Sequence, residues 1–216
     1  MSAEAHTQLT EGHKVSDVPT LPERIKAQIV GQILSGTLAP GDRLVELRIA
    51  KDMGTSQAPV REAIRDLEAL GLVETRRNRG AVIRRITPEE LIDLYAVRAQ
   101  LEGFAAELTA THAPQTASAL ARLCDEMEAA RGNPQAFVSL NTRFHRTIIE
   151  ASGNAPLLKI WERLDIQITT AVNRAARTEG LEAALADHRA ITAAIAQGDA
   201  RAARRAIQAH VNRVVL

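Results

Sequence analysis

The stretch from Thr55 to Gly71, TSQAPVREAIRDLEALG, constrains the fold of this chain more than any other. Read at helical period, it has an apolar face and a polar face. The apolar face holds Val60, Ala63, Ile64, Leu67 and Leu70, and the polar face holds Ala58, Arg61, Glu62 and Arg65. Ser56 is suited to accept a hydrogen bond from a first-turn amide, and Pro59 lies where its missing N–H costs nothing. The stretch predicts a helix that begins near Ser56, with one side in a core and the other facing outward.

Arg61 and Arg65 lie one turn apart on the outward face of this helix, beyond a start made of small residues. Such a helix fits the major groove of DNA, where a guanidinium bridges the two acceptors of guanine or holds a phosphate. An ordinary amphipathic surface helix is the alternative for this stretch alone. The segments on either side favour the DNA-binding interpretation.

The flanking segments complete the pattern of a winged helix-turn-helix, that is, three helices and a β-hairpin wing. The sequence predicts a helix at Leu21–Leu34, a turn at Gly36–Gly41, a short helix near Val45–Met53, and strands at Leu72–Arg77 and Ala81–Ile86 joined at Asn78-Arg79-Gly80. Five arginines crowd the hairpin, namely Arg76, Arg77, Arg79, Arg84 and Arg85. They are expected of a wing that lies against phosphates or enters a minor groove.

The chain contains the segment PGDRLVE from Pro40 to Glu46 and the motifs PVREAI, LE, GLV and RGA between Pro59 and Ala81. These motifs resemble the DNA-binding domain of the GntR family of bacterial transcription regulators. The resemblance implies DNA contacts by Arg48 (a phosphate), Ser56, Gln57 (a base edge), Arg61 and Arg65 (bases or phosphates), and Arg79 and Gly80 (the wing tip). Gln57 stands where the family usually has arginine. Because glutamine can read adenine with two hydrogen bonds, the operator sequence is expected to differ.

Composition and charge fit a regulator that works as a dimer. Residues 20–87 hold 12 lysines and arginines against 8 aspartates and glutamates, whereas residues 88–216 hold 14 against 15. This positive excess is modest, so a homodimer that doubles the phosphate contacts is expected. The sequence has neither an apolar run of membrane-spanning length nor a signal-peptide pattern, which predicts a cytoplasmic protein with no membrane partner. Cys124, the single cysteine, is expected to be a core thiol.

From Thr87 onward, the chain reads as six helices with short connections. Their predicted limits are residues 87–110, 114–130, 133–151, 156–177, 181–196 and 199–215, with Pro, Gly and Asn at the breaks and a capping box at Thr87 and Glu90. We therefore expect a mainly α fold with a disordered tail at residues 1–19, a winged helix-turn-helix at 20–86, and an antiparallel all-α six-helix bundle at 87–216.

The first helix of the bundle carries an arginine in its predicted core stripe. That stripe runs Leu91, Leu94, Arg98, Leu101, Ala105 and Leu108. A buried arginine needs a carboxylate or another anion as its partner. Two interpretations remain open for Arg98: it pairs with Glu102, four residues on, or it points into a cavity and receives a ligand carboxylate.

Three later helices each carry a histidine among aliphatic residues, namely His145, His188 and His210, with Asn141 one turn before His145. A single histidine of this kind is usually a satisfied core residue. Three on separate helices of one bundle favour a metal site, because three imidazole nitrogens suit zinc, nickel, cobalt or copper and leave one coordination position open.

The second half of the chain contains the motifs R..LE at Arg98–Glu102 and NTRFHRTIIEASGN at Asn141–Asn154, followed by His188 and His210 at a characteristic spacing. These features resemble the C-terminal FCD domain of the FadR branch of GntR regulators, in its six-helix VanR-like form. The resemblance implies a divalent metal, zinc or nickel first, held by Asn141, His145, His188 and His210, and a small organic acid as effector. The family commonly has Asp at Asn141. The neutral amide predicts weaker metal retention and a stronger pull on an anionic ligand.

These patterns predict an effector-controlled repressor of a palindromic double-stranded DNA operator, with no enzymatic activity. The main alternative is a metal-dependent hydrolase or lyase that uses the three histidines. Against it, Glu150 falls on a different helix face from His145, and Asp187 is expected to point away from His188, so no general base is well placed. An architectural DNA-binding protein without an effector is a second alternative, which the polar residues of the bundle interior argue against.

Overall fold

Two separate hydrophobic cores organise the chain. The computed structural model describes residues 18–77, 79–172 and 181–213. One core lies between residues 25 and 83 and the other between residues 95 and 211. The predicted tail falls outside the described residues except for Val18 and Pro19, as do the predicted helix ends at Arg177 and Val215.

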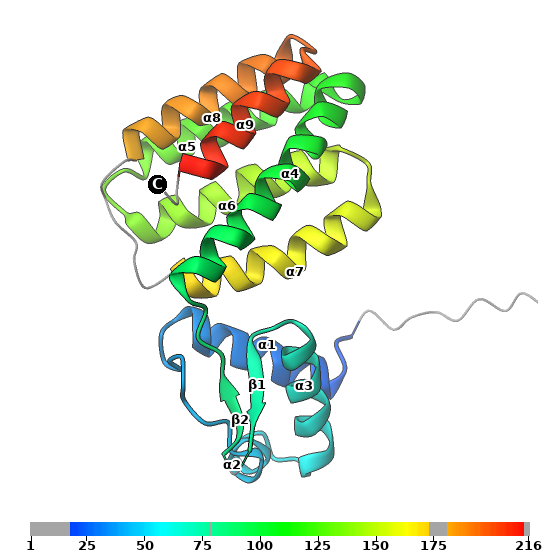
Figure 1. Cartoon of the computed structure of the whole chain (residues 1–216), viewed down its shortest axis with the longest axis vertical. Coiled ribbons are helices and arrows are strands. Elements are labelled where there is room, and N and C mark those ends of the chain that lie inside the picture. The colour runs from blue at the N-terminus through cyan, green and yellow to red at the C-terminus, as the bar shows by residue number, and fades with distance from the viewer. Residues whose placement is uncertain (1–17, 78, 173–180, 214–216) are drawn as a thin grey trace, which may run out of the picture.

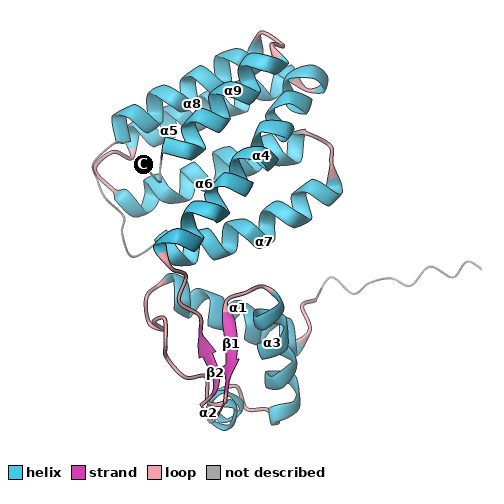
Figure 2. Ribbon diagram, viewed as in Figure 1, coloured by secondary structure: helices cyan, strands magenta, loops and turns pink. Residues whose placement is uncertain are grey.

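Three helices and a hairpin surround the first core (Figure 2). They are α1 (Leu21–Leu34), α2 (Glu46–Asp52), α3 (Gln57–Ala69), β1 (Val73–Arg76) and β2 (Gly80–Ile83). The strands are antiparallel, with Val73 opposite Ile83 and Arg76 opposite Gly80. Gly80 has a φ of 70°, which a side-chain-bearing residue rarely adopts, so glycine is needed where the wing turns back. This is the predicted winged helix-turn-helix.

Six helices enclose the second core within the described part of the chain (Figure 1). They are α4 (Pro88–His112), α5 (Ala117–Ala129), α6 (Pro134–Ala151), α7 (Ala155–Val172), α8 (Leu181–Ala196) and α9 (Ala200–Arg213). A 3₁₀ turn at Pro114–Thr116 precedes α5, so that helix begins three residues later than expected. The predicted mainly α fold class is confirmed.

The predicted core stripe of α4 was right for Arg98 and Ala105, which are buried, and wrong for its four leucines. The residues that α4 buries are Tyr95, Arg98, Ala99, Glu102, Gly103, Ala105, Ala106, Thr109 and Ala110, whereas Leu91, Leu94, Leu101 and Leu108 are half-buried. The helix packs against α6, α7, α8 and α9 and therefore has neighbours around most of its circumference. Close packing on several sides favours small residues at the centre and leaves the leucines at the margins.

The start of α4 also differs from expectation. Thr87 accepts a hydrogen bond from the Glu90 amide at 3.2 Å, as a capping residue should. The Glu90 carboxylate, however, pairs with Arg84 at 2.5 Å instead of returning to the Thr87 backbone, so half of the predicted capping box forms. Among the described residues, no helix is long and apolar enough to cross a bilayer.

Leu67 and Leu47 provide a matched test of the N-terminal core. Leu67 is fully buried, whereas Leu47 is 66% exposed. We expect Leu67→Ala to lower the free energy of unfolding by about 2–5 kcal/mol, because it leaves a cavity. Leu47→Ala is expected to change it by less than about 0.5 kcal/mol. Denaturant titration followed by circular dichroism measures both, and equal losses would contradict this core assignment.

Candidate functional site

The helix α3, predicted to be the recognition helix, begins at Gln57, with Ser56 as its N-cap. Ser56 has the extended backbone of a capping residue, but its side chain makes no capping hydrogen bond. The expectation that its hydroxyl would accept from a first-turn amide was therefore wrong. The side chain is exposed, so water can satisfy both the hydroxyl and the helix amides.

Arg61 is held at the surface by two neighbouring side chains. Its Nε donates to Glu46 Oε2 of α2 at 2.6 Å, and its NH2 donates to Gln57 Oε1 at 3.1 Å. The Arg61 and Glu46 side chains are 58% and 37% exposed, so the pair lies in water and adds little stability. The predicted DNA-contacting residues Gln57 and Arg61 thus lie together, with Glu46 as a partner that the sequence had not indicated.

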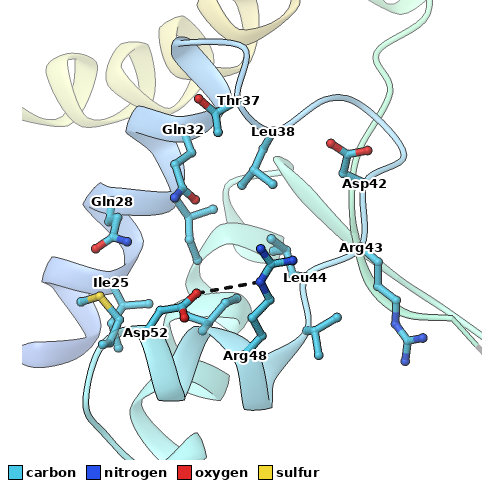
Figure 3. Close-up of a pocket in the computed structure, with 14 residues that line it drawn as sticks. Ile25, Gln28, Gln32, Thr37, Leu38, Asp42, Arg43, Leu44, Arg48 and Asp52 are labelled. Carbon is cyan, nitrogen blue, oxygen red and sulfur yellow. Dashed lines mark ion pairs between the residues drawn. The ribbon is translucent and has the colours of Figure 1, made fainter.

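Arg48 lies apart from that pair. Glu46 faces α3, and a residue two positions further along a helix is turned by about 200°, so Arg48 projects from the opposite side of α2. Its Nε is 4.0 Å from Asp52 Oδ2, at the edge of a cavity of about 410 Å³ between α1 and α2 (Figure 3). The cavity combines apolar residues such as Ile25 and Ile49 with polar ones such as Gln32.

The remaining predicted DNA contacts are all exposed. Arg65 follows Arg61 by one helical turn on α3, and Arg79 and Gly80 lie at the tip of the wing. Exposure is what a phosphate or base contact requires, but it does not test the contact itself. The DNA-contacting roles of these residues stay predictions.

The three histidines of the bundle lie close together in its interior. His145 comes from α6, His188 from α8 and His210 from α9, and all three are buried. Their ring centroids are 4.4–5.5 Å apart, and one ligating nitrogen from each lies within 4.8 Å of the others. Nitrogens on one zinc ion are roughly 3.4 Å apart, given bonds near 2.1 Å in a tetrahedron, so small side-chain movements suffice to hold a metal.

Carboxylates hold two of these rings by Nδ1. His145 Nδ1 is 2.6 Å from Glu102 Oε2, and His210 Nδ1 is 3.2 Å from Asp187 Oδ2. An ionised carboxylate only accepts, so each Nδ1 donates, and in a neutral ring the lone pair then lies on Nε2. Histidine metal ligands are commonly oriented in this way. Asp187 accepts from His210 and not from His188, and sequence reasoning had missed this role in orienting His210.

His188 has no such partner. Both of its ring nitrogens are buried and neither has a hydrogen-bond partner in the described part of the chain. A buried polar group without a partner is costly, and a bound ion is one recognised explanation for such a group. Together, the three imidazoles fit the ligand set of a divalent metal.

Burial keeps the imidazoles of His188 and His210 neutral. It lowers the pKa of His188 to about 2, and the neighbouring His145 and His210 add to the effect. Burial also lowers the pKa of His210 to about 4, against the opposing pull of Asp187. Neutral rings at pH 7 are what metal coordination needs, because a protonated imidazole has no lone pair to give.

Glu102 connects the histidines to Arg98. It is fully buried and accepts hydrogen bonds from Arg98 Nε at 2.6 Å and Trp161 Nε1 at 2.7 Å, in addition to His145. Burial raises the pKa of the Glu102 carboxyl, but Arg98 and His145 outweigh burial and hold it well below its usual range. The pairing of Arg98 with Glu102 is therefore present, and the ligand role of Arg98 stays a prediction.

Two further residues border this cluster. Asn141 lies one turn before His145 on α6 and is half-buried, and its role as a ligand stays a prediction. Asp165 of α7 has a buried Oδ1 with no hydrogen-bond partner among the described residues, 3.6 Å from Arg98 NH1. Burial raises the pKa of Asp165. Sequence reasoning had missed Asp165, although its spacing of four from Trp161 places both on one face of α7.

Comparison with known proteins identifies both halves of the chain. The model of bacterial regulatory proteins of the gntR family matches residues 21–83, and the model of the FCD domain matches residues 93–213. A probable D-xylose utilization operon transcriptional repressor of Paenarthrobacter nicotinovorans is 35% identical over 194 residues, covering 89% of this chain and 86% of that protein. The uncharacterized HTH-type transcriptional regulator YdhC of Bacillus subtilis is 30% identical over 191 residues, covering 86% and 85%.

Solved structures share the fold. E. coli McbR/YncC has a TM-score of 0.76 at 20% identity, covering 92% of this chain and 96% of that one. A putative GntR transcriptional regulator from Rhodococcus sp. RHA1 has a TM-score of 0.74 at 22% identity, covering 90% and 95%.

These matches are to transcription regulators rather than to enzymes, so the hydrolase or lyase alternative is not supported. The chain belongs to the GntR family of bacterial transcription regulators, with an N-terminal helix-turn-helix domain followed by an FCD domain.

Proposed function

We propose that this protein is a metabolite-responsive repressor that binds a palindromic operator as a homodimer and senses a small organic acid at a metal in its bundle. The observation that carries the sensing half is the meeting of three buried imidazoles, one of which, His188, has no hydrogen-bond partner among the described residues. Repression is supported by the names of two similar proteins, the D-xylose utilization operon repressor and a gluconate operon transcriptional repressor of Bacillus licheniformis.

In the proposed site, His145, His188 and His210 hold a divalent ion, with Asn141 as a fourth ligand. Zinc and nickel are favoured because imidazole suits both. The ion supplies positive charge and an open coordination position for a carboxylate. Arg98 is the second group proposed to meet the effector, through guanidinium hydrogens that Glu102 does not occupy.

On DNA, the two recognition helices of a dimer lie one helical turn apart and enter successive major grooves. Arg61 and Arg65 then contact bases or phosphates, and Gln57 contacts a base edge. Arg48 is proposed to meet a phosphate, Ser56 lies at the start of the recognition helix, and Arg79 and Gly80 form the wing tip.

The two halves touch through α1 and α7, and α7 carries Asp165 and Trp161 beside the Arg98–Glu102 pair. An effector with different affinities for two arrangements of these elements changes the spacing of the recognition helices and thereby operator affinity. The proposed repressor acts in the cytoplasm.

Metal analysis tests the sensing site directly. Protein purified without a His tag or chelator is expected to contain about one divalent ion per chain, because each chain supplies a full ligand set. His145→Ala/His188→Ala should lose the ion, whereas His112→Ala, at the exposed end of α4, should keep it. Plasma mass spectrometry measures the content. Wild-type protein without metal after separate zinc and nickel supplementation would contradict the proposal.

The lowered histidine pKa values predict a pH dependence in metal-free protein. Between pH 7 and pH 5, His188 and His210 stay neutral when folded but take up protons when unfolded, so the free energy of unfolding falls as the pH falls. His188→Gln should reduce this slope by about 1 kcal/mol per pH unit near the acid end of that window. Urea titrations in EDTA measure the slope; an unchanged slope in the variant would refute the assignment.

Operator binding tests the other half of the proposal. On a duplex selected from a random pool, Arg61→Ala should weaken binding by about tenfold or more, because a bidentate base contact is lost. An acid that raises the thermal stability of metal-loaded protein should release this duplex and have no effect on metal-stripped protein. Fluorescence anisotropy measures both effects. Folded Arg61→Ala that binds within a factor of two of wild type would show that α3 is not the reading helix.

A further inference from the structure

Three side chains form one hydrogen-bonded unit on the outward side of the helix-turn-helix. Glu46 of α2 accepts from Arg61 Nε, and Gln57 accepts from Arg61 NH2, at 2.6 Å and 3.1 Å. We infer that Glu46 and Gln57 set the base preference of this unit: a guanine opposite Arg61, and a keto base, guanine or thymine, opposite Gln57. This inference rests on the proposed function, in which α3 reads the operator.

The Glu46 contact restricts how Arg61 can approach a base. A guanidinium can bridge guanine O6 and N7 either with its two terminal nitrogens or with Nε and one terminal nitrogen. Nε already donates to Glu46, and NH2 uses one of its two hydrogens on Gln57. One hydrogen on each terminal nitrogen is therefore left for the base. Because the carboxylate comes from a different helix, it also limits rotation of the arginine side chain. Glu46 is therefore a positioning residue that presents Arg61 end-on.

The Arg61 contact decides which end of the Gln57 amide faces outward. An arginine only donates, so the amide atom beside it must be the oxygen, and the ambiguity between amide oxygen and nitrogen does not arise here. Reading adenine with two hydrogen bonds requires the oxygen for the adenine amino group as well as the nitrogen for N7. With the oxygen turned toward Arg61, the NH2 group is what Gln57 offers to a base.

An NH2 donor distinguishes bases by the group they display in the major groove. In the major groove, guanine displays two acceptors, N7 and O6, and thymine displays the acceptor O4 with no donor beside it. Adenine accepts at N7, but its neighbouring amino group repels a second donor, and cytosine displays only an amino donor. Gln57 therefore favours guanine or thymine over adenine and cytosine. This revises the expectation from sequence, in which Gln57 read adenine.

Glu46 should also leave an electrostatic signature. Its carboxylate, 37% exposed, lies beside the arginine that enters the groove and repels the phosphates of any DNA. Removing it should therefore strengthen or preserve binding to random DNA while weakening discrimination. If Glu46 merely supported the fold, its removal would weaken both the binding to random DNA and the discrimination between sequences.

Selection from a randomised duplex pool tests the Gln57 preference with the full-length protein. Wild type and Gln57→Ala are compared, and the base read by Gln57 is the position whose preference disappears in the variant. Guanine or thymine there in the wild type is the expected result. Adenine or cytosine would overturn the inference but leave the proposed function intact, whereas a wild type that enriches no sequence would refute both.

Competition titrations test Glu46. In Glu46→Ala, the ratio of affinities for the selected duplex and a random duplex should fall about tenfold, with random binding equal to or tighter than wild type. Glu62→Ala removes the same charge from an exposed position on α3. This control variant should bind the selected duplex and the random duplex more tightly without changing the ratio of the two affinities. Glu46→Gln keeps an oxygen for Arg61 Nε and should retain the wild-type ratio. A ratio in Glu46→Ala within twofold of wild type would overturn the inference.

Discussion

The buried carboxylate of Glu102 is the contact on which the bundle and its candidate site both depend. It is fully shielded from water and accepts from Arg98, His145 and Trp161 at 2.6–2.7 Å. Removing a charge from water is costly, and only several well-placed donors offset that cost. Because those donors come from α4, α6 and α7, one side chain joins three helices and also fixes the ring orientation of a candidate metal ligand.

The orientation of the rings follows from this arrangement. Glu102 and Asp187 each fix a histidine by Nδ1, whereas the ring nitrogens of His188 have no such contact among the described residues. An ion at that point would connect α6, α8 and α9, and through Glu102 also α4 and α7. Since α7 touches α1, a change at the rings has a physical route to the DNA-binding half.

Much of the fold could be predicted from the sequence because its helix ends carry explicit signals. The limits of α1 and α8 match the predicted ones, since Pro and Gly mark the breaks. The histidine stripes likewise followed from helical period. The partners of those histidines could not be predicted, because Glu102 meets His145 across 43 residues and Trp161 across 59, and such contacts depend on how helices pack. The burial of the α4 leucines was misjudged for the same reason.

Arginine–carboxylate pairs occur in both halves of the chain, and their burial separates their roles. Arg98 and Glu102 are 8% and 0% exposed, so breaking that pair would leave an uncompensated charge in the interior. Arg61 and Glu46 are 58% and 37% exposed, and water can replace either partner at little cost. The first pair is thus fixed in the fold, while the second orients Arg61 at the surface through Nε and leaves hydrogens on its terminal nitrogens for the proposed base contact.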